Sequence, residues 1–191
     1  MCFLHLVASF GWCLTVRSGD VSSTFLQGKE NTGEPLHMFP PSQGLPGIEA
    51  GLILRLQKAV YGRPDAPRTW FDMFSGVLVN DFGFERSWLD PDKGCPIAMI
   101  VMHVDDILLA TNSSIAVKEK INLLQKRFPF GEWSLAHEKT EGVIYCSNRI
   151  RAIMESGDYV ILLGQEHFVL CRLEKIELSK SRASELDSPP P

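Results

Sequence analysis

Residues 97–110 read IAMIVMHVDDILLA, and this stretch is the most informative part of the chain. Apolar residues, rich in β-branched side chains, run from Ile97 to Met102 and again from Ile107 to Ala110. Short apolar runs of this kind are typical of buried strands, although such a run alone does not exclude a helix. We therefore predict two strands joined as a hairpin, with Asp105 and Asp106 at its tip.

Two adjacent carboxylates repel each other unless a cation neutralises them. Magnesium binds proteins through one or two carboxylates together with the phosphates of a substrate. The pair therefore predicts a site for Mg²⁺ or Mn²⁺. For the pair taken alone, the alternative is a solvated turn, because Asp is a common turn residue.

The bulk composition describes an ordinary globular chain of 191 residues, 45% hydrophobic and 22% charged, with enough material for one domain with a core. A net charge of −4 argues against binding nucleic acid over the whole surface but allows a local basic channel. Five widely spaced cysteines without a Cys-x-x-Cys pair indicate reduced thiols. We expect no signal peptide, because residues 1–16 lack a basic n-region and no small-x-small cleavage pattern follows them. We expect no membrane span, because no apolar stretch approaches about 18 residues.

Apolar periodicity outward from the hairpin predicts an alternation of helices and strands. We expect a helix at residues 3–11, a strand-like segment at 12–16, a short helix within 20–26, a strand at 52–56, helices at 66–82 and 114–128, two strands within 143–163 and a final helix at 165–178. Residues 28–51, rich in Gly and Pro, predict a long irregular excursion. This order predicts an α+β fold, a mainly antiparallel sheet with helices packed on one face.

Three patches occur in a fixed order: RSGDVSSTFLQG at residues 17–28, LQKAVYGRPDAPRTW at 56–70 and MHVDDILL at 102–109. Together they resemble the reverse transcriptase of copia-type retrotransposons. Flanking pieces agree with the resemblance, namely Gly83-Phe84 followed by Asp90-Pro91, and residues 128–133. The resemblance covers nearly the whole chain, from its start to about residue 180.

The resemblance implies an RNA-directed DNA polymerase that transfers nucleotides to a primer 3′-hydroxyl with two metal ions. It assigns catalysis to Asp20, Asp105 and Asp106, with Asp106 contributing less directly than its neighbour. These three carboxylates, together with the backbone carbonyl of Val21, would hold Mg²⁺ or Mn²⁺. The expectation requires Asp20, at the end of one strand, to meet Asp105 at the hairpin tip.

The resemblance also assigns the nucleotide site. Phe25 would pack beneath the incoming sugar and exclude a 2′-hydroxyl, the group that distinguishes ribonucleotides; the alternative is a core Phe on a short helix. Arg68 would lie near the nucleotide or the template strand, or would pair on its own helix with Asp65 or Asp72.

Two positions depart from the family pattern. His103 stands where Tyr is more common, and it would lie near the primer end or serve only as a strand residue. Asp65 stands where a Gln usually donates to the nucleotide or template, and its negative charge would repel phosphates if it pointed at them.

By resemblance the fold is a palm-like sheet with partial fingers and a truncated thumb. Residues 1–163 would form the palm with partial fingers, 164–180 the start of a thumb-like helix and 181–191 a disordered Pro-rich tail. Because only residues 1–19 precede Asp20, we expect a fragment of a longer polyprotein.

The expected partners are an RNA or DNA template with its primer, deoxynucleoside triphosphates and the other parts of the polyprotein, with no membrane. The expected location is a cytoplasmic particle or the nucleus. Two alternatives stay open: a catalytically inactive retrotransposon remnant, and an unrelated metal-dependent phosphodiesterase that uses the same carboxylates.

Overall fold

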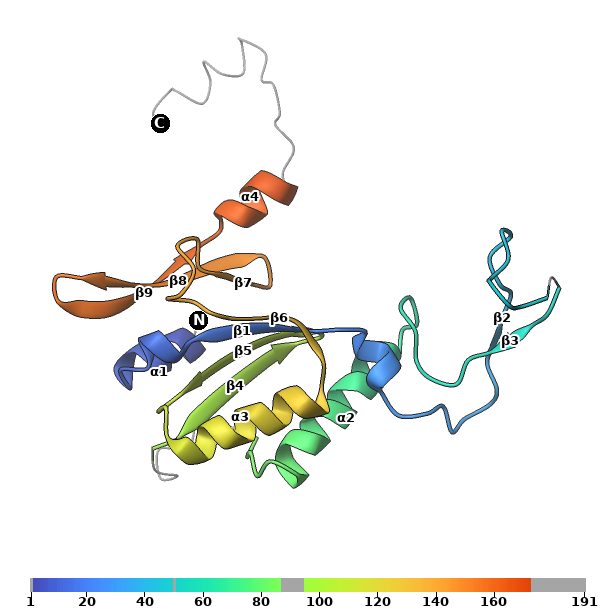
Figure 1. The fold of residues 1–191 in the computed structure, drawn as a ribbon, viewed down its shortest axis with the longest axis horizontal. Coiled ribbons are helices and arrows are strands. Elements are labelled where there is room, and N and C mark those ends of the chain that lie inside the picture. The colour runs from blue at the N-terminus through green and yellow to red at the C-terminus, as the bar shows by residue number, and fades with distance from the viewer. Residues whose placement is uncertain (1, 50, 87–94, 173–191) are drawn as a thin grey trace, which may run out of the picture.

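The computed structural model describes residues 2–49, 51–86 and 95–172, which form two antiparallel sheets, flanking helices and a projecting ribbon (Figure 1). The larger sheet has the strand order β4-β5-β1-β6. Its strands are β1 (Arg17–Val21), β4 (Ala98–His103), β5 (Asp106–Thr111) and β6 (Phe130–Leu135). The predicted hairpin at residues 97–110 is confirmed as the antiparallel pair of β4 and β5.

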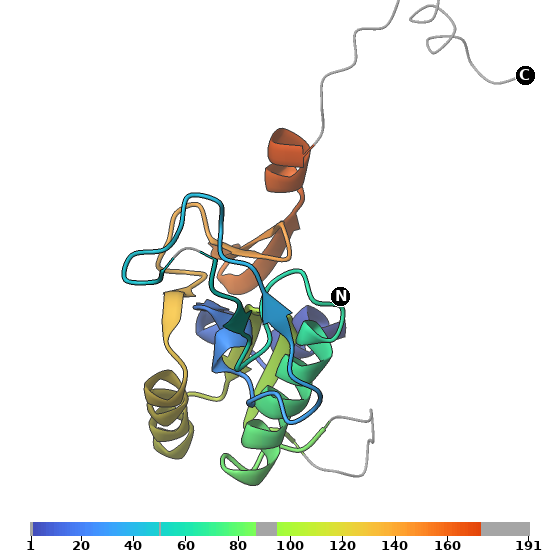
Figure 2. The ribbon, with the colours of Figure 1, turned by 90° about the vertical axis from the view of Figure 1, so that its right-hand side faces the viewer.

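One face of the larger sheet is covered by α2 (Ala66–Asn80) and α3 (Ile115–Arg127), which lie below it in Figure 1 and are seen beside one another in Figure 2, α2 in green and α3 in dark yellow. The two helices match the predicted segments 66–82 and 114–128. The core on this face includes Trp70 and Phe74 of α2, Leu124 of α3, and Ile107 of β5. The apolar stripes of the sequence therefore pack into the core, as predicted.

The other face carries α1 (Cys2–Ser9) and a three-stranded sheet of β7 (Val143–Tyr145), β8 (Asn148–Glu155) and β9 (Asp158–Gly164). Val7 and Ile150 pack there with Leu108 and Ala110 of β5. Because successive side chains of a strand point to opposite faces, the apolar run of β5 needs a cover on both sides. The prediction of helices on one face was therefore incomplete, since α1 and a second sheet occupy the opposite face.

The segment before β1 differs from the prediction. A strand-like segment was expected at residues 12–16, but Cys13–Thr15 form a 3₁₀ helix, η1, and the strand begins at Arg17. The Thr15 hydroxyl contacts the carbonyl oxygens of Trp12 and Thr111, both at 2.8 Å. The first contact is local and the second joins the segment to β5, and together they favour a turn over an extended chain.

After β1 the expected helix within 20–26 is shorter and lies later, as the 3₁₀ helix η2 (Thr24–Gln27) without a side-chain cap. The irregular excursion then projects from the sheets as a ribbon with β2 (His37–Met38) and β3 (Leu54–Arg55) (Figure 1). Residues 143–163 hold three strands where two were predicted, because a second turn lies at Cys146–Ser147.

The chain continues into α4 (Glu166–Arg172), within the predicted helix 165–178. The rest of that segment, the Asp90-Pro91 pair and the tail 181–191 lie outside the described residues. Among the described residues, none of the helices combines the length and the apolar character that crossing a bilayer requires.

Candidate functional site

Three carboxylates meet at one end of the larger sheet. One oxygen each from Asp20, Asp105 and Asp106 lie within 4.8 Å of one another. Asp20 is exposed, and the other two are partly buried. The structure thus brings the first sequence patch and the hairpin tip to the same place.

Strand pairing explains this convergence. β1 runs antiparallel to β5, and the register places Asp20 opposite Asp106. The backbone N–H of Val21 donates to the carbonyl oxygen of Asp105 at 3.0 Å, which joins the end of β1 to the hairpin tip. On its other side, β1 shifts register against β6 between Asp20 and Val21. Irregularities of this kind re-aim side chains and are common next to active sites.

The hairpin tip is a two-residue turn, since His103 pairs with Asp106 and leaves Val104 and Asp105 between them. Val104 has a φ of 55°, which is unusual for a β-branched residue and is maintained only where neighbouring groups support it. The indole Nε1 of Trp70 donates to the carbonyl oxygen of Val104 at 2.7 Å. The core helix α2 therefore supports the turn that carries Asp105.

Two glycines shape the surroundings of Asp20. A Cβ added to Gly19 would lie 2.3 Å from Cε3 of Trp133, so the indole can pack against β1 only because this position has no side chain. A Cβ added to Gly131 would lie 3.4 Å from Oδ2 of Asp20. Glycine within a strand indicates a close approach of this kind, and the sequence contained that signal at Gly19.

The charges of the three carboxylates are not fully compensated by the protein. Burial raises the pKa of Asp20, and the charges of Asp105, Asp106 and Glu132 raise it further. Burial also raises the pKa of Asp106, although a hydrogen bond from the backbone of Cys146 partly offsets this. A bound divalent cation would remove the repulsion between these groups.

The donor set fits such a cation. Carboxylate oxygens are the hard ligands that Mg²⁺ and Mn²⁺ prefer, and the three oxygens are close enough to share an ion. The predicted fourth ligand, the carbonyl oxygen of Val21, accepts a hydrogen bond from Oγ1 of Thr24 at 2.7 Å. A carbonyl oxygen has two lone pairs, so this bond leaves one for a cation.

Phe25 and His103, which were predicted to lie at the nucleotide and near the primer end, have different environments in the structure. Phe25 is 5% exposed, belongs to the main core, and its ring stands edge-on to Tyr61 at 4.6 Å between centroids. This packing corresponds to the core alternative for Phe25. His103 is exposed and pairs with Asp106 across the hairpin, where its charge partly offsets the rise in the pKa of that carboxyl that burial causes.

Asp65 and Arg68 each have a partner nearby in the sequence, and neither belongs to the acidic group. Oδ1 of Asp65 accepts a hydrogen bond from Nε of Arg63 at 2.9 Å, and this bond lowers the pKa of Asp65. Nε of Arg68 donates to Oδ2 of Asp72 at 2.8 Å. Of the alternatives for Arg68, pairing with Asp72 is the one that the structure contains.

The sequence did not reveal two groups that contact the acidic cluster. The backbone N–H of Cys146, in the β7–β8 turn, donates to Oδ2 of Asp106 at 3.2 Å. Glu132 of β6 lies opposite Asp20 in the register and pairs with Lys139. The Cys146 contact depends on a turn forty residues from Asp106, and no local pattern marks it.

We predict that Asp20→Asn stabilises the cation-free protein at neutral pH. In the folded state the pKa of Asp20 lies above its unfolded value, so folding favours the protonated carboxyl. The free energy of unfolding therefore falls as the pH rises from the unfolded pKa through the folded pKa. Removing the charge should raise the free energy of unfolding by roughly 0.5 kcal/mol, a small gain because solvent screens exposed charges.

Urea titrations in EDTA at pH 7 and pH 3 measure this effect. The difference between variant and parent should disappear at pH 3, where the Asp20 carboxyl is protonated in both states. A variant that is less stable than the parent at pH 7 would contradict the predicted repulsion.

Comparisons with known proteins agree with this arrangement. A profile of the family described as reverse transcriptase (RNA-dependent DNA polymerase) matches residues 3–179. The chain is 30% identical over 127 residues to the retrovirus-related Pol polyprotein from transposon RE2 of Arabidopsis thaliana, a match that covers 64% of this chain and 8% of that polyprotein. It is 29% identical over 118 residues, 59% of this chain and 8% of the relative, to the corresponding polyprotein from transposon RE1 of the same plant. The chain therefore belongs to the reverse transcriptase family of copia-type retrotransposons.

Proposed function

We propose that the chain is the RNA-directed DNA polymerase module of a copia-type Pol polyprotein. The observation that carries this proposal is the convergence of Asp20, Asp105 and Asp106 within 4.8 Å in a chain of this family. The matched part spans 8% of each relative, so we further propose that the module works as part of a longer polyprotein.

In the proposed reaction the 3′-oxygen of a primer attacks the α-phosphorus of a deoxynucleoside triphosphate. A new phosphorus–oxygen bond forms, the bond to the β-phosphate breaks, and pyrophosphate leaves while the hydroxyl loses its proton. Two Mg²⁺ or Mn²⁺ ions, held by the three carboxylates and the Val21 carbonyl, would lower the pKa of the hydroxyl and neutralise charge on the phosphates.

The chain's own contribution is to fix the positions of the carboxylates. The β1–β5 register, the Val21–Asp105 backbone bond and the Trp70–Val104 bond keep the carboxylates together before any ligand arrives. Such preorganisation avoids reorganisation during the reaction. In this proposal Arg68 and Asp65 lie on the nucleotide side and His103 lies beside the primer end.

We further propose a subdomain assignment for the fold. The sheets and helices of residues 1–163 form the palm, and the ribbon of β2 and β3 forms the partial fingers. The helix α4 begins the thumb-like segment 164–180. The support is the order of elements around the acidic group. The strand β1 is followed by the helix α2, the hairpin β4–β5, the helix α3 and the strand β6.

Primer extension tests the proposal. An oligo(dT) primer on poly(rA), supplied with dTTP and either Mg²⁺ or Mn²⁺, should be lengthened by the chain and not in EDTA. Cation binding without any incorporation would instead identify an inactive remnant. Nuclease activity that survives Phe25→Ala and disappears with Asp20→Asn would identify a phosphodiesterase.

We predict that Phe25→Val allows incorporation of ribonucleotides. In the proposal the ring of Phe25 leaves no room for a 2′-hydroxyl, and Val removes most of that ring. The ratio of dTTP to UTP incorporation should fall by about tenfold or more, since losing a steric contact of this size changes discrimination by about 1–3 kcal/mol.

Phe82→Val is the matched control because Phe82 is a Phe of the same core, placed just beyond the end of α2. Both variants lose core packing, and only Phe25→Val should change the sugar preference. An unchanged dTTP to UTP ratio in folded Phe25→Val would refute the gate and leave Phe25 as a core residue.

A further inference from the structure

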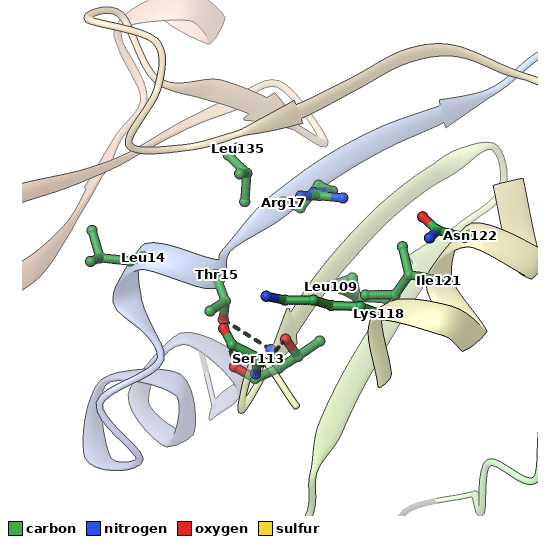
Figure 3. A pocket seen from close by; sticks show the side chains of 10 residues that line it. Leu14, Thr15, Arg17, Leu109, Ser113, Lys118, Ile121, Asn122 and Leu135 are labelled. Carbon is green, nitrogen blue, oxygen red and sulfur yellow. Dashed lines mark hydrogen bonds between the residues drawn. The ribbon is translucent and has the colours of Figure 1, made fainter. Parts of the chain in front are cut away.

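A cavity lies on the face of the larger sheet that α3 covers. It has a volume of about 410 Å³ and lies between the sheet, η1 and α3 (Figure 3). The Ser18 hydroxyl contacts β7, so the neighbouring Arg17 points to the opposite face, toward α3. The acidic group lies on the β7–β8 side, where Asp106 meets Cys146. We call this cavity the Arg17 pocket.

The Arg17 pocket contains a cationic side chain that has no hydrogen-bond acceptor within the described part of the chain. The guanidinium of Arg17 is partly buried, and among the described residues it makes no hydrogen bond and no ion pair. Burial lowers the pKa of Arg17, and the charge of Glu138 partly offsets this effect. The Arg17 Cζ lies 5.4 Å from the ring centroid of Trp133, a contact that offers no oxygen acceptor. Partly buried donors of this kind favour a ligand that supplies acceptors.

A second cation enters from α3. Lys118 extends across the pocket toward η1 (Figure 3), and its ammonium group forms no ion pair with the described residues. Two cations from different elements at one cavity suit a carboxylate or a phosphate, for which Arg provides paired donors and Lys a point charge.

The remaining walls are apolar on one part and polar on another, where Thr15, Thr111, Ser113 and Asn122 line the pocket. Leu14, Leu109, Ile121 and Leu135 line the pocket beside the two cations. A cavity of 300–1,000 Å³ with apolar walls and a few placed polar groups is the usual form of a small-molecule site, and about 410 Å³ falls in that range.

We propose that the Arg17 pocket binds a small organic anion that has an apolar body and a phosphate or carboxylate group. The anionic group lies between Arg17 and Lys118, and the apolar body lies against the leucines and Ile121. A nucleic-acid strand does not fit this description, because its charges are distributed along a polymer too large for the cavity. The site is independent of the proposed polymerase reaction.

Calorimetric titration with 1-naphthyl phosphate tests the proposal on the full chain. This probe combines an aromatic body with a phosphate, and 1-naphthol and inorganic phosphate each carry half of it. The complete probe should bind at least about tenfold more tightly than either half, because each half lacks one class of contact.

Arg17→Gln and Lys118→Gln should each weaken binding of 1-naphthyl phosphate by about tenfold. Lys126→Gln is the matched control, since it removes the same charge from the exposed last turn of α3 and should leave binding unchanged. Where Arg17→Gln fails to fold, Arg17→Lys keeps the charge but loses the paired donors and should show intermediate affinity.

Three outcomes would overturn the proposal: equal affinity in folded Arg17→Gln, equal affinity for 1-naphthol and 1-naphthyl phosphate, or competition by oligo(dT) at similar concentration. The last would identify a nucleic-acid contact. Because the titration requires no polymerase activity, its result is separate from that of primer extension.

Discussion

Asp105→Asn should lower primer extension by about a thousandfold or more, the effect expected when a group that stabilises transition-state charge is lost. The substitution keeps the size and the side-chain oxygen but removes one of the three negative charges that meet within 4.8 Å. The remaining two carboxylates would hold two divalent cations poorly, because each ion is bound mainly by charge. Incorporation of labelled dTTP on poly(rA) measures the loss.

Asp158→Asn provides the matched control. Asp158 is an exposed residue at the β8–β9 turn, at the opposite end of β8 from the turn that contacts Asp106. The Asp158→Asn substitution makes the same chemical change away from the acidic group, so its dTTP incorporation should match that of the parent. Activity of Asp105→Asn within a few fold of the parent would exclude Asp105 from the catalytic machinery.

Trp70→Ala should destabilise the fold by about 3–5 kcal/mol, the usual cost of removing a buried large aromatic side chain. Trp70 is 1% exposed and packs against Phe74 and Phe128, with ring centroids 5.1 and 5.7 Å away. Its indole also donates to Val104 at the hairpin tip. The substitution therefore removes core packing and the support of a strained turn together, and urea titration measures the sum.

Two controls separate these contributions. Phe71→Ala removes an aromatic ring from the neighbouring position of α2, but Phe71 is 43% exposed and its loss should cost less than about 1 kcal/mol. Trp70→Phe keeps an aromatic ring and removes the donor to Val104, and we expect a cost of about 1 kcal/mol because a partly buried carbonyl loses its partner. A cost for Trp70→Ala no larger than that for Phe71→Ala would contradict the packing.

The spacing of apolar residues along the chain predicted the helices and the hairpin, which depend mainly on neighbouring residues. The helix at 114–128 was expected from apolar spacing, and α3 occupies Ile115–Arg127 with Ser114 and Phe128 at its ends. The hairpin was expected because two apolar runs flank a turn, and it is present. Its two-residue tip carries Val104 and Asp105, one position earlier than the predicted Asp105 and Asp106, and Asp106 is the first residue of β5. The helix predicted at 66–82 is α2 (Ala66–Asn80), and Trp70 on it is buried in the core.

Features that depend on distant partners were not predictable. The apolar run of β5 is consistent with cover on one face or on both, and only the complete structure shows the second sheet above Leu108 and Ala110. Aromatic and β-branched residues favoured a strand at 12–16, but the Thr15 side chain contacts Thr111, 96 residues away, and the chain turns there. The contact of Cys146 with Asp106 requires the β7–β8 turn to reach the hairpin, which no local propensity encodes.

The most direct measurement is the affinity of the chain for Mn²⁺, followed by electron paramagnetic resonance of the free ion. The parent should bind Mn²⁺, and Asp20→Asn and Asp105→Asn should each weaken that binding by about tenfold or more, since each removes a ligand charge. Asp158→Asn should bind like the parent. Equal Mn²⁺ affinity in all four proteins would contradict a cation site built from the carboxylates of β1 and the β4–β5 hairpin.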